Sequence, residues 1–526
     1  MVTKTPCHFC SSHCGMLVNI ENNRAVKLVE APCERSCPAG IDVPRYMRLI
    51  ADGRFDEAIR AIREKVPFPG VLGCICTHPC EAECYRSESD EALSIRALKA
   101  FVSKHDTGAR KEKPKVAEPN GKKVAIVGSG PAGLTAGYYL ARLGYGGTVF
   151  EALPAAGGML RVGIPEYRLP REVLDREIEE IKSAGVEIKT NSKVGSLDML
   201  FGQGYNAVFV AVGAHQGVKL PIPGSELNGV LIGISFLKNM NMGVESKIGK
   251  RVVVLGGGNV AFDCARTALR LGATDVHMAC LESRDNMVAT TEEIEQGEAE
   301  GITIHNSQTF TQIMGKDGQV SGVECLNVRS FAFDSEGELH VDSIAGSEHV
   351  LPADTVIFAV GQVPELERIE GISEIKASRQ PTLIADSVTM MTVKEGVYAG
   401  GDAVTGPASV IEAIADGRRA AISIDKFLGG RGDINEVLAS PPVEMSPSGI
   451  GEVEGFKYRL PVNMIPVAER TESFVQVELG FDQEKAIEEA RRCLWCDLAD
   501  GDPEHPISHG WSCKRGRAHT ARRFVS

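Results

Sequence analysis

Short apolar runs and amphipathic segments alternate along most of the chain and predict its main elements. Between residues 124 and 430, β-branched runs of strand length alternate with segments of helical spacing, which is typical of parallel α/β units. Ahead of them, residues 46–65 and 93–104 have helical spacing, with a break at Gly53. A last helix is expected over residues 482–492.

Two less regular stretches separate these regions. Residues 108–123 are charged and carry two prolines, so we expect a linker there. Residues 431–475 are rich in proline, serine and glycine, and we expect them to be extended. The chain has 526 residues, and at roughly 150 residues per domain this length predicts about three or four domains.

A glycine-rich turn opens the first α/β unit. The apolar run from residue 124 leads into Gly128-x-Gly130-x-x-Gly133, then a helical segment, then a second apolar run that ends in Glu151. Such glycines allow a tight turn and close approach of the backbone to a pyrophosphate, which the helix N-terminus binds. An acid placed like Glu151 can accept bonds from ribose hydroxyls. Together they predict a dinucleotide site, with a ligand-free glycine turn as the alternative.

A second unit of the same kind follows, and it is the only internal repeat in the sequence. Gly256-x-Gly258-x-x-Ala261 opens a helical segment, and the next apolar run ends at Glu282. Two dinucleotide sites in one chain suggest hydride transfer between a nicotinamide and a flavin. No CxxC lies beside these motifs, which argues against a redox disulfide.

Composition then narrows the chemistry. The net charge of −13 argues against a nucleic-acid binder. No apolar run reaches the ~18 residues of a membrane span, and the N-terminal residues lack the apolar core of a signal peptide. Of the 15 cysteines, nine lie between Cys7 and Cys84 and three at Cys493 and beyond. This clustering favours cluster or metal ligation in a reducing, cytoplasmic compartment.

Further motifs carry a family resemblance over about residues 31–430. Residues 359–364 (AVGQVP) and 397–402 (VYAGGD) follow the glycine turns in the order of the two-dinucleotide-fold flavoprotein reductases. Residues 157–170 and 252–273 resemble the glutamate synthase small subunit, and are similar to matching domains of dihydropyrimidine dehydrogenase and of the bifurcating ferredoxin–NADP transhydrogenase large subunit. The resemblance implies two Rossmann-like domains and flavin-borne chemistry without a catalytic side chain.

The resemblance also implies which residues bind the nucleotides. It places Asp402 on the ribityl–phosphate side of FAD and points the N-terminus of a helix near Ala408 at the flavin. The implied FAD residues are Gly128, Gly130, Pro131, Ala132, Gly133, Glu151, Gly158, Met159, Gly213, Gly401, Asp402, Ser409 and Val410. The implied NAD residues are Gly256, Gly258, Asn259, Val260, Ala261, Glu282, Arg284 and Gly361.

One departure from the family bears on the choice of nicotinamide nucleotide. In NADPH-using relatives the second strand of this unit ends in Tyr-Arg-Arg, whereas here the matching residues are Cys280, Leu281 and Glu282. A carboxylate accepts bonds from a free 2′-hydroxyl and repels a 2′-phosphate. We therefore predict NAD(H) over NADP(H), with Arg284 as the residue that can restore phosphate binding.

The resemblance also implies iron–sulfur ligands. By family logic, one 4Fe–4S cluster is held by Cys37, Cys76, Cys80 and Cys84, with zinc as the alternative for any four-cysteine set. Relatives carry an EAxRCLxC segment upstream, but here it lies far downstream, at residues 489–496. We predict that it folds back so that Cys33, Cys493 and Cys496 share a second cluster. Cys74 is a candidate fourth ligand, and an open or non-cysteine position is equally consistent, because Lys99 stands where relatives have Gln or Glu.

The two ends of the chain resemble one further module. Cys7-x2-Cys10-x3-Cys14-Gly is similar to the N-terminal 4Fe–4S module of molybdopterin oxidoreductases such as formate dehydrogenase, and residues 501–517 are similar to the continuation of that module. The flavoprotein is then inserted in a split module, whose cluster is closed by Cys7, Cys10, Cys14 and Cys513. The large molybdopterin domains are absent from the sequence, so a partner subunit is expected to carry that chemistry.

These inferences predict an α/β protein with two Rossmann-like domains, a helical iron–sulfur domain and a small split cap. We expect an electron-transfer flavoprotein subunit that uses NAD(H), FAD and three 4Fe–4S clusters. We expect its partner to be a molybdenum or tungsten formate dehydrogenase, a hydrogenase or ferredoxin. The alternative functions are a glutamate synthase small subunit that uses NADPH, an electron-bifurcating subunit and a scaffold without cofactors. The expected domains are 1–30 with 500–526 (cap), 31–120 (iron–sulfur), 121–245 with 355–430 (FAD), 246–354 (NAD) and 431–499 (tail and last helix).

Overall fold

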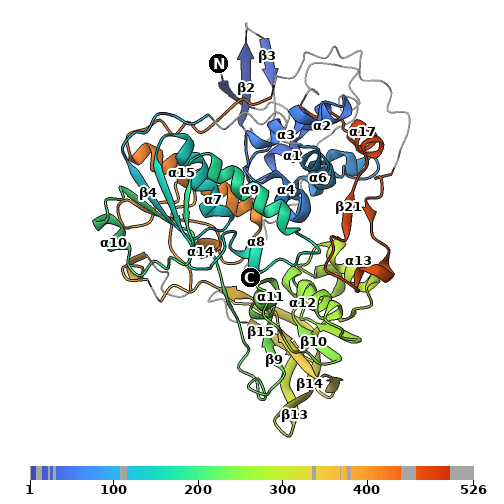
Figure 1. Ribbon diagram of the computed structural model, residues 1–526. Coiled ribbons are helices and arrows are strands. Elements are labelled where there is room, and N and C mark those ends of the chain that lie inside the picture. Colours follow the sequence, from blue (N-terminus) through green and yellow to red (C-terminus); the bar gives the residue numbers. More distant parts are fainter. Residues whose placement is uncertain are drawn as a thin grey trace. The chain divides into compact units, whose positions relative to one another are not determined.

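The computed structural model describes two compact units (Figure 1). The described residues are 2–6, 15–21, 24–27, 31–106, 115–334, 339–367, 369–375, 381–439 and 458–497. The first unit draws on Met1–Glu112, Asn435–Asn463 and Gly480–Phe524, and the second mainly on Lys113–Ile434 and Met464–Leu479. The cysteines that the sequence assigns to clusters and the two glycine turns thus belong to different units.

The first unit is helical apart from one small antiparallel sheet. Its elements are β1 (Val2–Pro6), β2 (Gly15–Glu21), β3 (Arg24–Lys27), α1 (Pro32–Arg35), α2 (Val43–Ala51), α3 (Phe55–Arg63), α4 (Pro69–Ile75), α5 (Pro79–Ala82), η1 (Tyr85–Glu88), α6 (Ile95–His105) and α17 (Gln483–Arg491). The predicted helices over 46–65, with its break at Gly53, over 93–104 and over 482–492 are confirmed.

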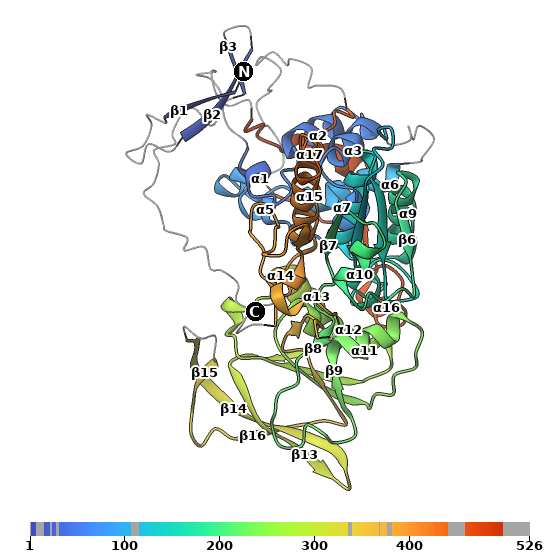
Figure 2. The same ribbon diagram turned by 90° about the vertical axis from the view of Figure 1, so that its left-hand side faces the viewer.

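Packing inside the first unit follows from its sequence pattern. Helix α3 buries Ala58, Ile59, Ala61 and Ile62, the spacing of a single helical face. Gly73 of α4 lies so close to α6 that a Cβ would come within 2.6 Å of the Cα of Ala100. Helix α17 packs against α2, although the two are far apart in sequence (Figure 2).

The second unit begins with a five-stranded parallel sheet of order β19-β7-β4-β5-β6. Its strands are β4 (Lys123–Val127), β5 (Gly146–Phe150), β6 (Glu187–Lys189), β7 (Ala207–Val210) and β19 (Val397–Ala399). The associated helices are α7 (Pro131–Arg142), α8 (Met159–Val162), α9 (Arg171–Ser183), α10 (Leu197–Gly202), α14 (Asp402–Thr405) and α15 (Val410–Phe427). Strand β7 is buried along its whole length, as a strand covered on both faces is.

A second parallel sheet of five strands has the order β12-β11-β10-β17-β9. Its elements are β9 (Val230–Ile232), α11 (Gly233–Asn241), β10 (Arg251–Leu255), α12 (Asn259–Arg270), β11 (Asp275–Ala279), η2 (Arg284–Asn286), α13 (Thr291–Ala299), β12 (Thr303–His305) and β17 (Thr355–Phe358). Because β9 and β17 pair within this sheet, it extends beyond the expected 246–354 on both sides. Both strands are short apolar runs, which fit either sheet equally well.

Antiparallel strands and short elements complete the second unit. Strands β13 (Gln308–Lys316), β14 (Gln319–Phe333), β15 (Leu339–Ser343) and β16 (His349–Pro352) pair around β14. The remaining elements are β8 (Gln216–Gly217), β18 (Gln362–Val363), η3 (Ser373–Ile375), β20 (Asn463–Met464), α16 (Val467–Arg470) and β21 (Glu478–Gly480). The expectation of extended structure over 431–475 thus gives way to a short helix at α16, within the described part of that stretch.

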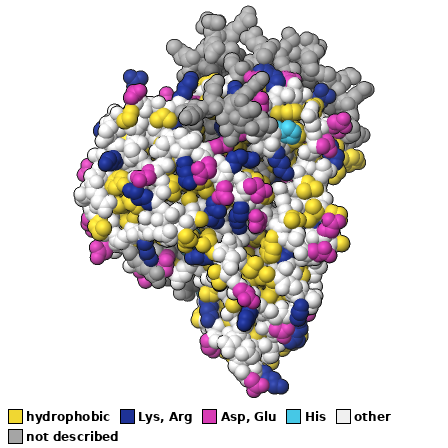
Figure 3. All heavy atoms as spheres, viewed as in Figure 1, with side chains coloured by type: hydrophobic (Ala, Val, Ile, Leu, Met, Phe, Trp, Pro, Cys, Tyr) yellow, Lys and Arg dark blue, Asp and Glu magenta, His cyan; other side chains and the backbone are white. Residues whose placement is uncertain are grey.

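Two surface properties follow from the described residues. None of the described helices is both long and apolar enough to cross a membrane. On the face drawn in Figure 3, acidic and basic side chains are interspersed. The net charge of −13 is therefore not gathered into one acidic patch on that face.

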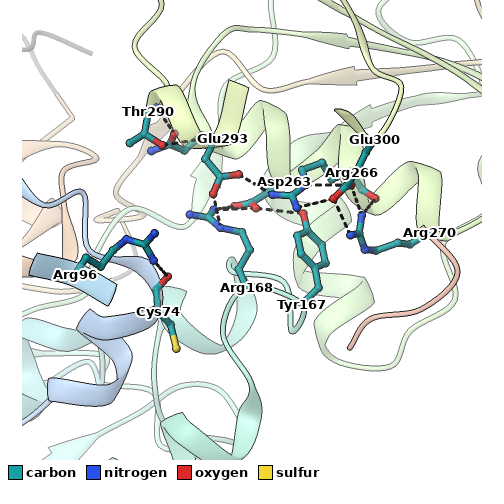
Figure 4. A network of polar contacts seen from close by, with 11 residues as sticks. Cys74, Arg96, Tyr167, Arg168, Asp263, Arg266, Arg270, Thr290, Glu293 and Glu300 are labelled. Atoms are coloured by element: carbon teal, nitrogen blue, oxygen red, sulfur yellow. Dashed lines mark hydrogen bonds and ion pairs between the residues drawn. The ribbon is translucent and has the colours of Figure 1, made fainter. Parts of the chain in front are cut away.

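A buried ionic network joins the segment after α8 to helices α12 and α13 (Figure 4). Arg168 pairs with Asp263 on α12 and with Glu293 on α13, both at 2.8 Å. Arg266 and Arg270 each pair with Glu300 at 2.7 Å. The guanidinium of Arg270 also lies 3.8 Å from the ring centroid of the buried Tyr167 (1% exposed). Because Arg168 lies between β5 and β6 of the first parallel sheet, the network ties the first nucleotide-binding domain to the second.

Candidate functional site

The first glycine turn connects β4 to α7. Gly128 has φ +107, and a Cβ there would lie 2.3 Å from the carbonyl oxygen of Ala211. A Cβ on Gly133 would lie 2.0 Å from the carbonyl oxygen of Gly128, so this glycine allows the helix to approach the turn. A Cβ on Gly130, in contrast, would have no neighbouring atom within 4 Å. The open space at Gly130 beside the N-terminus of α7 is where a pyrophosphate fits.

Glu151 lies at the end of β5 and faces this turn. The backbone N–H of Ser129 donates to its carboxylate at 3.1 Å, and the hydroxyl of Ser129 also donates to it. The N–H of Leu153 donates to the other oxygen at 2.8 Å. Glu151 is 6% exposed, so its carboxylate is held beside the glycine turn, as the sequence predicted for a residue that binds ribose.

The other implied FAD residues lie near α7 and at the start of α15. Gly158 approaches Gly130, where a Cβ would come within 2.8 Å of the Gly130 Cα, and Met159 begins α8. Gly401 packs on α7, where a Cβ added at Gly401 would lie 3.2 Å from the Cβ of Ala132. The N–H of Gly401 donates to Asp416 at 2.8 Å. Gly213 follows β7, beside the ring of His215.

The start of α15 is capped by its own side chains. Ser409 and Glu412 form a capping box, and Val410 is the first helical residue. Asp402 accepts a bond from the N–H of Ala408 at 3.3 Å. Burial, with contributions from Asp416 and Glu412, raises the pKa of Asp402 to about 7. The Asp402 carboxyl is thus able to carry a proton near neutral pH and to donate to an acceptor.

The second glycine turn, between β10 and α12, repeats the geometry of the first. Gly256 has φ +131, and a Cβ there would lie 2.3 Å from the carbonyl oxygen of Ala359, just ahead of Gly361. A Cβ on Gly258 would meet only the Val288 side chain, at 3.6 Å, so there is again room at the N-terminus of α12. In α12, Asn259 accepts from the N–H of Thr290 at 3.0 Å, and Ala261 is fully buried next to Val260.

One acidic and one basic side chain, Glu282 and Arg284, flank the second turn. A Cβ on Gly257 would lie 3.0 Å from a carboxylate oxygen of Glu282 and 3.0 Å from the sulfur of Cys280. Glu282 therefore faces the turn as Glu151 faces the first one. Arg284 is directed to Glu298 on α13, at 2.7 Å, in an exposed pair. Gly257 is a close neighbour that the spacing pattern alone did not single out.

In the first unit, the C-terminal helix brings its cysteines to the N-terminal ones. Arg48 on α2 pairs with Asp497 at 2.7 Å, and Arg86 donates to the backbone carbonyl of Arg492 at 2.9 Å. The N–H of Ser94 donates to the buried Glu489 at 2.9 Å. These contacts surround the 493–496 segment with side chains from α2, η1 and the start of α6.

Several cysteine side chains of the first unit influence one another electrostatically. Besides burial, Cys493, Cys80, Cys84 and Cys496 raise the pKa of Cys33. Burial and then Cys84 raise the pKa of Cys496 to about 12. Cys84 is thus an electrostatic neighbour of Cys33, Cys493 and Cys496, and Cys80 is also a neighbour of Cys33. The grouping of Cys84 with Cys37, Cys76 and Cys80 stays a prediction from sequence.

Cys37, Cys76 and Cys80 are all buried. Lys99 on α6 faces these three sulfurs: burial would lower its pKa, but Cys76, Cys80 and Cys37, and then Glu81, raise it. Cys74 accepts a bond from Arg96 through its backbone carbonyl, at 3.2 Å (Figure 4).

The donor set fits iron–sulfur clusters. Tyr46 is fully buried, and its hydroxyl has no hydrogen-bond partner among the described residues, although Cys80, Cys33 and Cys37 are its electrostatic neighbours. A cluster sulfide is an acceptor that such a hydroxyl can use. Within the described ranges, no three His, Cys, Asp or Glu side chains lie close enough together to bind a single metal ion such as zinc. The ligands of a four-iron cluster bind different iron atoms and are therefore spaced more widely than the ligands of one zinc ion.

The remaining predicted residues divide by position. Cys7, Cys10, Cys14 and Cys513 lie outside the described residues. Cys264 lies on α12, Cys280 follows β11 and Cys325 lies in β14, and all three are buried. Sequence patterns had no signal for Tyr46 or for the Arg168 network, because their partners are distant in the chain.

Comparison with known proteins agrees with this geometry. The family model for pyridine nucleotide-disulphide oxidoreductases matches residues 122–417. The model for dihydropyrimidine dehydrogenase domain II, a 4Fe-4S cluster domain, matches residues 8–111. In the solved structure of FprA from Mycobacterium tuberculosis, the match has a TM-score of 0.50 at 21% identity and covers 59% of this chain and 85% of that one, which shows the fold alone.

Two curated relatives have higher identity. The NADP(+)-dependent formate dehydrogenase subunit beta of Moorella thermoacetica is 40% identical over 508 residues, covering 89% of this chain and 71% of the relative. The glutamate synthase (NADPH) small chain of Escherichia coli is 34% identical over 418 residues, covering 75% of this chain and 88% of the relative. The chain therefore belongs to the pyridine nucleotide-disulphide oxidoreductase family, as a glutamate synthase small subunit-like FAD/NAD(P) iron–sulfur oxidoreductase.

Proposed function

We propose that this chain is the electron-transfer flavoprotein subunit of a larger redox complex. The observation that carries the proposal is the combination of two glycine turns of dinucleotide-binding geometry in one unit with seven buried or half-buried free cysteines, Cys33, Cys37, Cys76, Cys80, Cys84, Cys493 and Cys496, in the other. FAD, when bound, supplies the conversion between two-electron and one-electron transfer. The chain's own residues bind and orient: Glu151 and the N-terminus of α7 hold one nucleotide, and Glu282 and the N-terminus of α12 hold the other.

The second site, in this proposal, takes NAD(H) in preference to NADP(H). The Glu282 carboxylate lies beside Gly257, where it can accept bonds from a ribose 2′-hydroxyl and repels a 2′-phosphate. Arg284 is paired with Glu298. Both relatives named above carry NADP in their names, so the proposal sets this chain apart from them. Dye reduction by purified protein at equal, low NADH and NADPH concentrations tests it, and faster reduction with NADPH would refute it.

For the cysteines, we propose one cluster on Cys33, Cys84, Cys493 and Cys496 and another on Cys37, Cys76 and Cys80. The first cluster is supported by Cys84 as an electrostatic neighbour of Cys493 and Cys496, and by the Arg48–Asp497 pair that holds residue 497 against α2. A third cluster on Cys7, Cys10, Cys14 and Cys513 remains the expectation from sequence. Iron and acid-labile sulfide on the full chain test the number, since three four-iron clusters give about twelve irons and two give about eight.

The proposed partner is a molybdenum- or tungsten-containing formate dehydrogenase subunit in the cytoplasm. The name of the Moorella relative supports it, as does the similarity of the two chain ends to a molybdopterin-enzyme module. Anaerobic pull-down of the tagged full chain from its host, with molybdenum, tungsten, iron and flavin counted on the complex, tests this. Co-purification of a glutamine amidotransferase subunit instead would make the chain a glutamate synthase small subunit.

A further inference from the structure

The loop that carries Glu282 is hydrogen-bonded along its length to the loop that follows β12. The N–H of Cys280 donates to the carbonyl of His305 at 3.1 Å, and the N–H of Gln308 donates to the carbonyl of Cys280 at 2.8 Å. The N–H of Ser307 donates to the carbonyl of Glu282 at 3.0 Å. Because β11 and β12 are neighbouring parallel strands, their two following loops lie side by side at the edge where nucleotides bind.

The side chain of Asn306 adds a bond to the same carbonyl. Its Nδ2 donates to the carbonyl of Glu282 at 3.2 Å and to the sulfur of Cys280 at 3.6 Å. The thiol of Cys280 in turn donates to the Glu282 carbonyl at 3.7 Å. Burial, and then Glu282, raise the pKa of Cys280 to about 12, so the thiol keeps its proton near neutral pH. The Glu282 carbonyl thus accepts from Ser307, Asn306 and Cys280.

Ser307 has a backbone conformation that residues other than glycine rarely adopt. Its φ is +54, in the left-handed region, where a serine is strained. Its N–H bonds Glu282, and its carbonyl accepts from the N–H of Val328 at 2.8 Å. Such strain persists only where the surrounding structure imposes it. The Asn306 amide, which bonds the same carbonyl from the preceding residue, is part of that restraint.

The main chain at Glu282 matters because it decides where the carboxylate lies. A carboxylate oxygen of Glu282 is 3.0 Å from the place that a Cβ on Gly257 would take, at the second glycine turn. A carboxylate accepts from a ribose 2′-hydroxyl and repels a 2′-phosphate as long as it stays at that place. If the loop moved outward, a 2′-phosphate would no longer meet the negative charge. Rejection of NADP(H) therefore requires a fixed main chain at Glu282.

We propose that Asn306 is a positioning residue for nucleotide selection, whose amide fixes the main chain of Glu282 and so holds the carboxylate against a 2′-phosphate. This rests on the proposed function, in which the second site prefers NAD(H). Asn306 acts through Glu282 and not on hydride transfer, so it governs binding of the adenosine end. Loss of the amide also loosens the strained turn at Ser307, because both residues donate to one acceptor.

The first test is equilibrium binding of two probes to the purified full chain, measured by calorimetry. Adenosine 5′-monophosphate and adenosine 2′,5′-bisphosphate differ only in the 2′-phosphate. Asn306→Leu keeps the shape and removes the donor, and Asn306→His keeps an N–H at similar reach. We expect N306L to reduce the preference for the monophosphate roughly fivefold, about the effect of one hydrogen bond, and N306H to retain it. An unchanged preference in folded N306L would overturn the proposal.

The second measurement separates this inference from the proposed function. We compare kcat and KM with NADH and with NADPH in wild type, E282A, N306L and the double variant. N306L should lower the NADH-to-NADPH ratio of kcat/KM through KM, at unchanged kcat, and have no further effect in the E282A background. A ratio that changes in E282A but not in N306L overturns this inference alone. A ratio that E282A leaves unchanged contradicts the proposed nucleotide preference, and this inference with it.

Asn327→Leu is the matched control for the turn. The side-chain oxygen of Asn327 accepts from Gln308 at 2.9 Å, so this amide contacts the turn at Gln308 rather than at Glu282. We expect N327L to keep the nucleotide preference, and equal losses in N327L and N306L would overturn the proposal. If N306L does not fold, Asn306→Asp keeps the size and replaces the donor with an acceptor. Equal preferences in N306D and wild type would then overturn it.

Discussion

Arg168 donates from one guanidinium nitrogen to both carboxylate oxygens of Asp263, at 2.9 and 2.8 Å, across 95 positions of sequence. The same side chain reaches Glu293 on α13 through its Nε, at 2.8 Å. All three side chains are at most 15% exposed. Arg168 therefore pairs with two buried carboxylates on the second nucleotide-binding domain, and Glu293 has a second partner in Arg266 at 3.0 Å.

Replacing Arg168 is expected to destabilise the second unit strongly. Arg168→Met leaves Asp263 and Glu293 buried without this partner, a change that typically costs ~3–5 kcal/mol of unfolding free energy. Chemical denaturation of the FAD-loaded protein measures it. Arg284→Ala removes an exposed pair with Glu298 and serves as the control, with an expected loss below about 1 kcal/mol. Equal losses in the two variants would contradict the role of the network.

Glu282 is expected to set the nucleotide preference. Glu282→Ala removes the acceptor beside Gly257, so kcat/KM with NADH should fall roughly tenfold, while that with NADPH should not fall. Steady-state dye reduction with each nucleotide measures the ratio. Arg284→Ala is the matched variant, because it should lower activity with NADPH only. An unchanged ratio in E282A would remove Glu282 from the specificity argument.

Asp402 is expected to make the FAD-free protein less stable as pH rises. Burial raises the pKa of Asp402 to about 7 from its ordinary 3.8. The protonated carboxyl of Asp402 is favoured in the folded protein. Its contribution to the free energy of unfolding is fully present below pH 3.8 and is lost as the pH rises through about 7. Urea unfolding of the apoprotein between pH 5 and pH 8 should show a decline that Asp402→Asn lacks, on the order of a few kcal/mol. Parallel curves for the two proteins would argue against a protonated Asp402.

Cys84 is expected to belong to the same cluster as Cys493. Cys84→Ser and Cys493→Ser should each abolish the same paramagnetic signal of the dithionite-reduced protein, and the double variant should lose nothing more. Cys76→Ser should abolish a different signal. Cys264→Ser, in the buried core of α12, is the control that keeps all the iron. If C84S and C76S remove one and the same signal, the sequence-based grouping of Cys84 is the correct one.

Local motifs made the nucleotide turns predictable. Gly128, Gly256 and the acids that follow them act within one strand–turn–helix segment, so spacing alone locates them. The course of the chain around the cysteines was not readable in this way. His78 adopts φ 41 just before Pro79 begins α5, the helix that carries Cys80. Regular spacing contains no information on that turn.

Long-range pairing was equally hidden from the sequence. Strands β9 and β17 are apolar runs of three and four residues, and nothing in them specifies which parallel sheet they join. Arg168 and Asp263 lie on segments with no shared periodicity. The fold-back of residues 489–496 was predicted because a family motif stood in an unusual place, and the contacts of Glu489, Arg492 and Asp497 with the N-terminal helices agree with it.

The packing of α17 on α2 has a consequence for biosynthesis. Chains emerge from the ribosome N-terminus first, and domains generally fold in that order. Helix α2 and Cys33 are made early, but Arg48 meets Asp497 only after the whole two-nucleotide unit has been translated. The cluster proposed on Cys33, Cys84, Cys493 and Cys496 can therefore be completed only after the two-nucleotide unit has been translated. A chain truncated before Cys493 cannot acquire it, and the flavin-binding unit is always present when it forms.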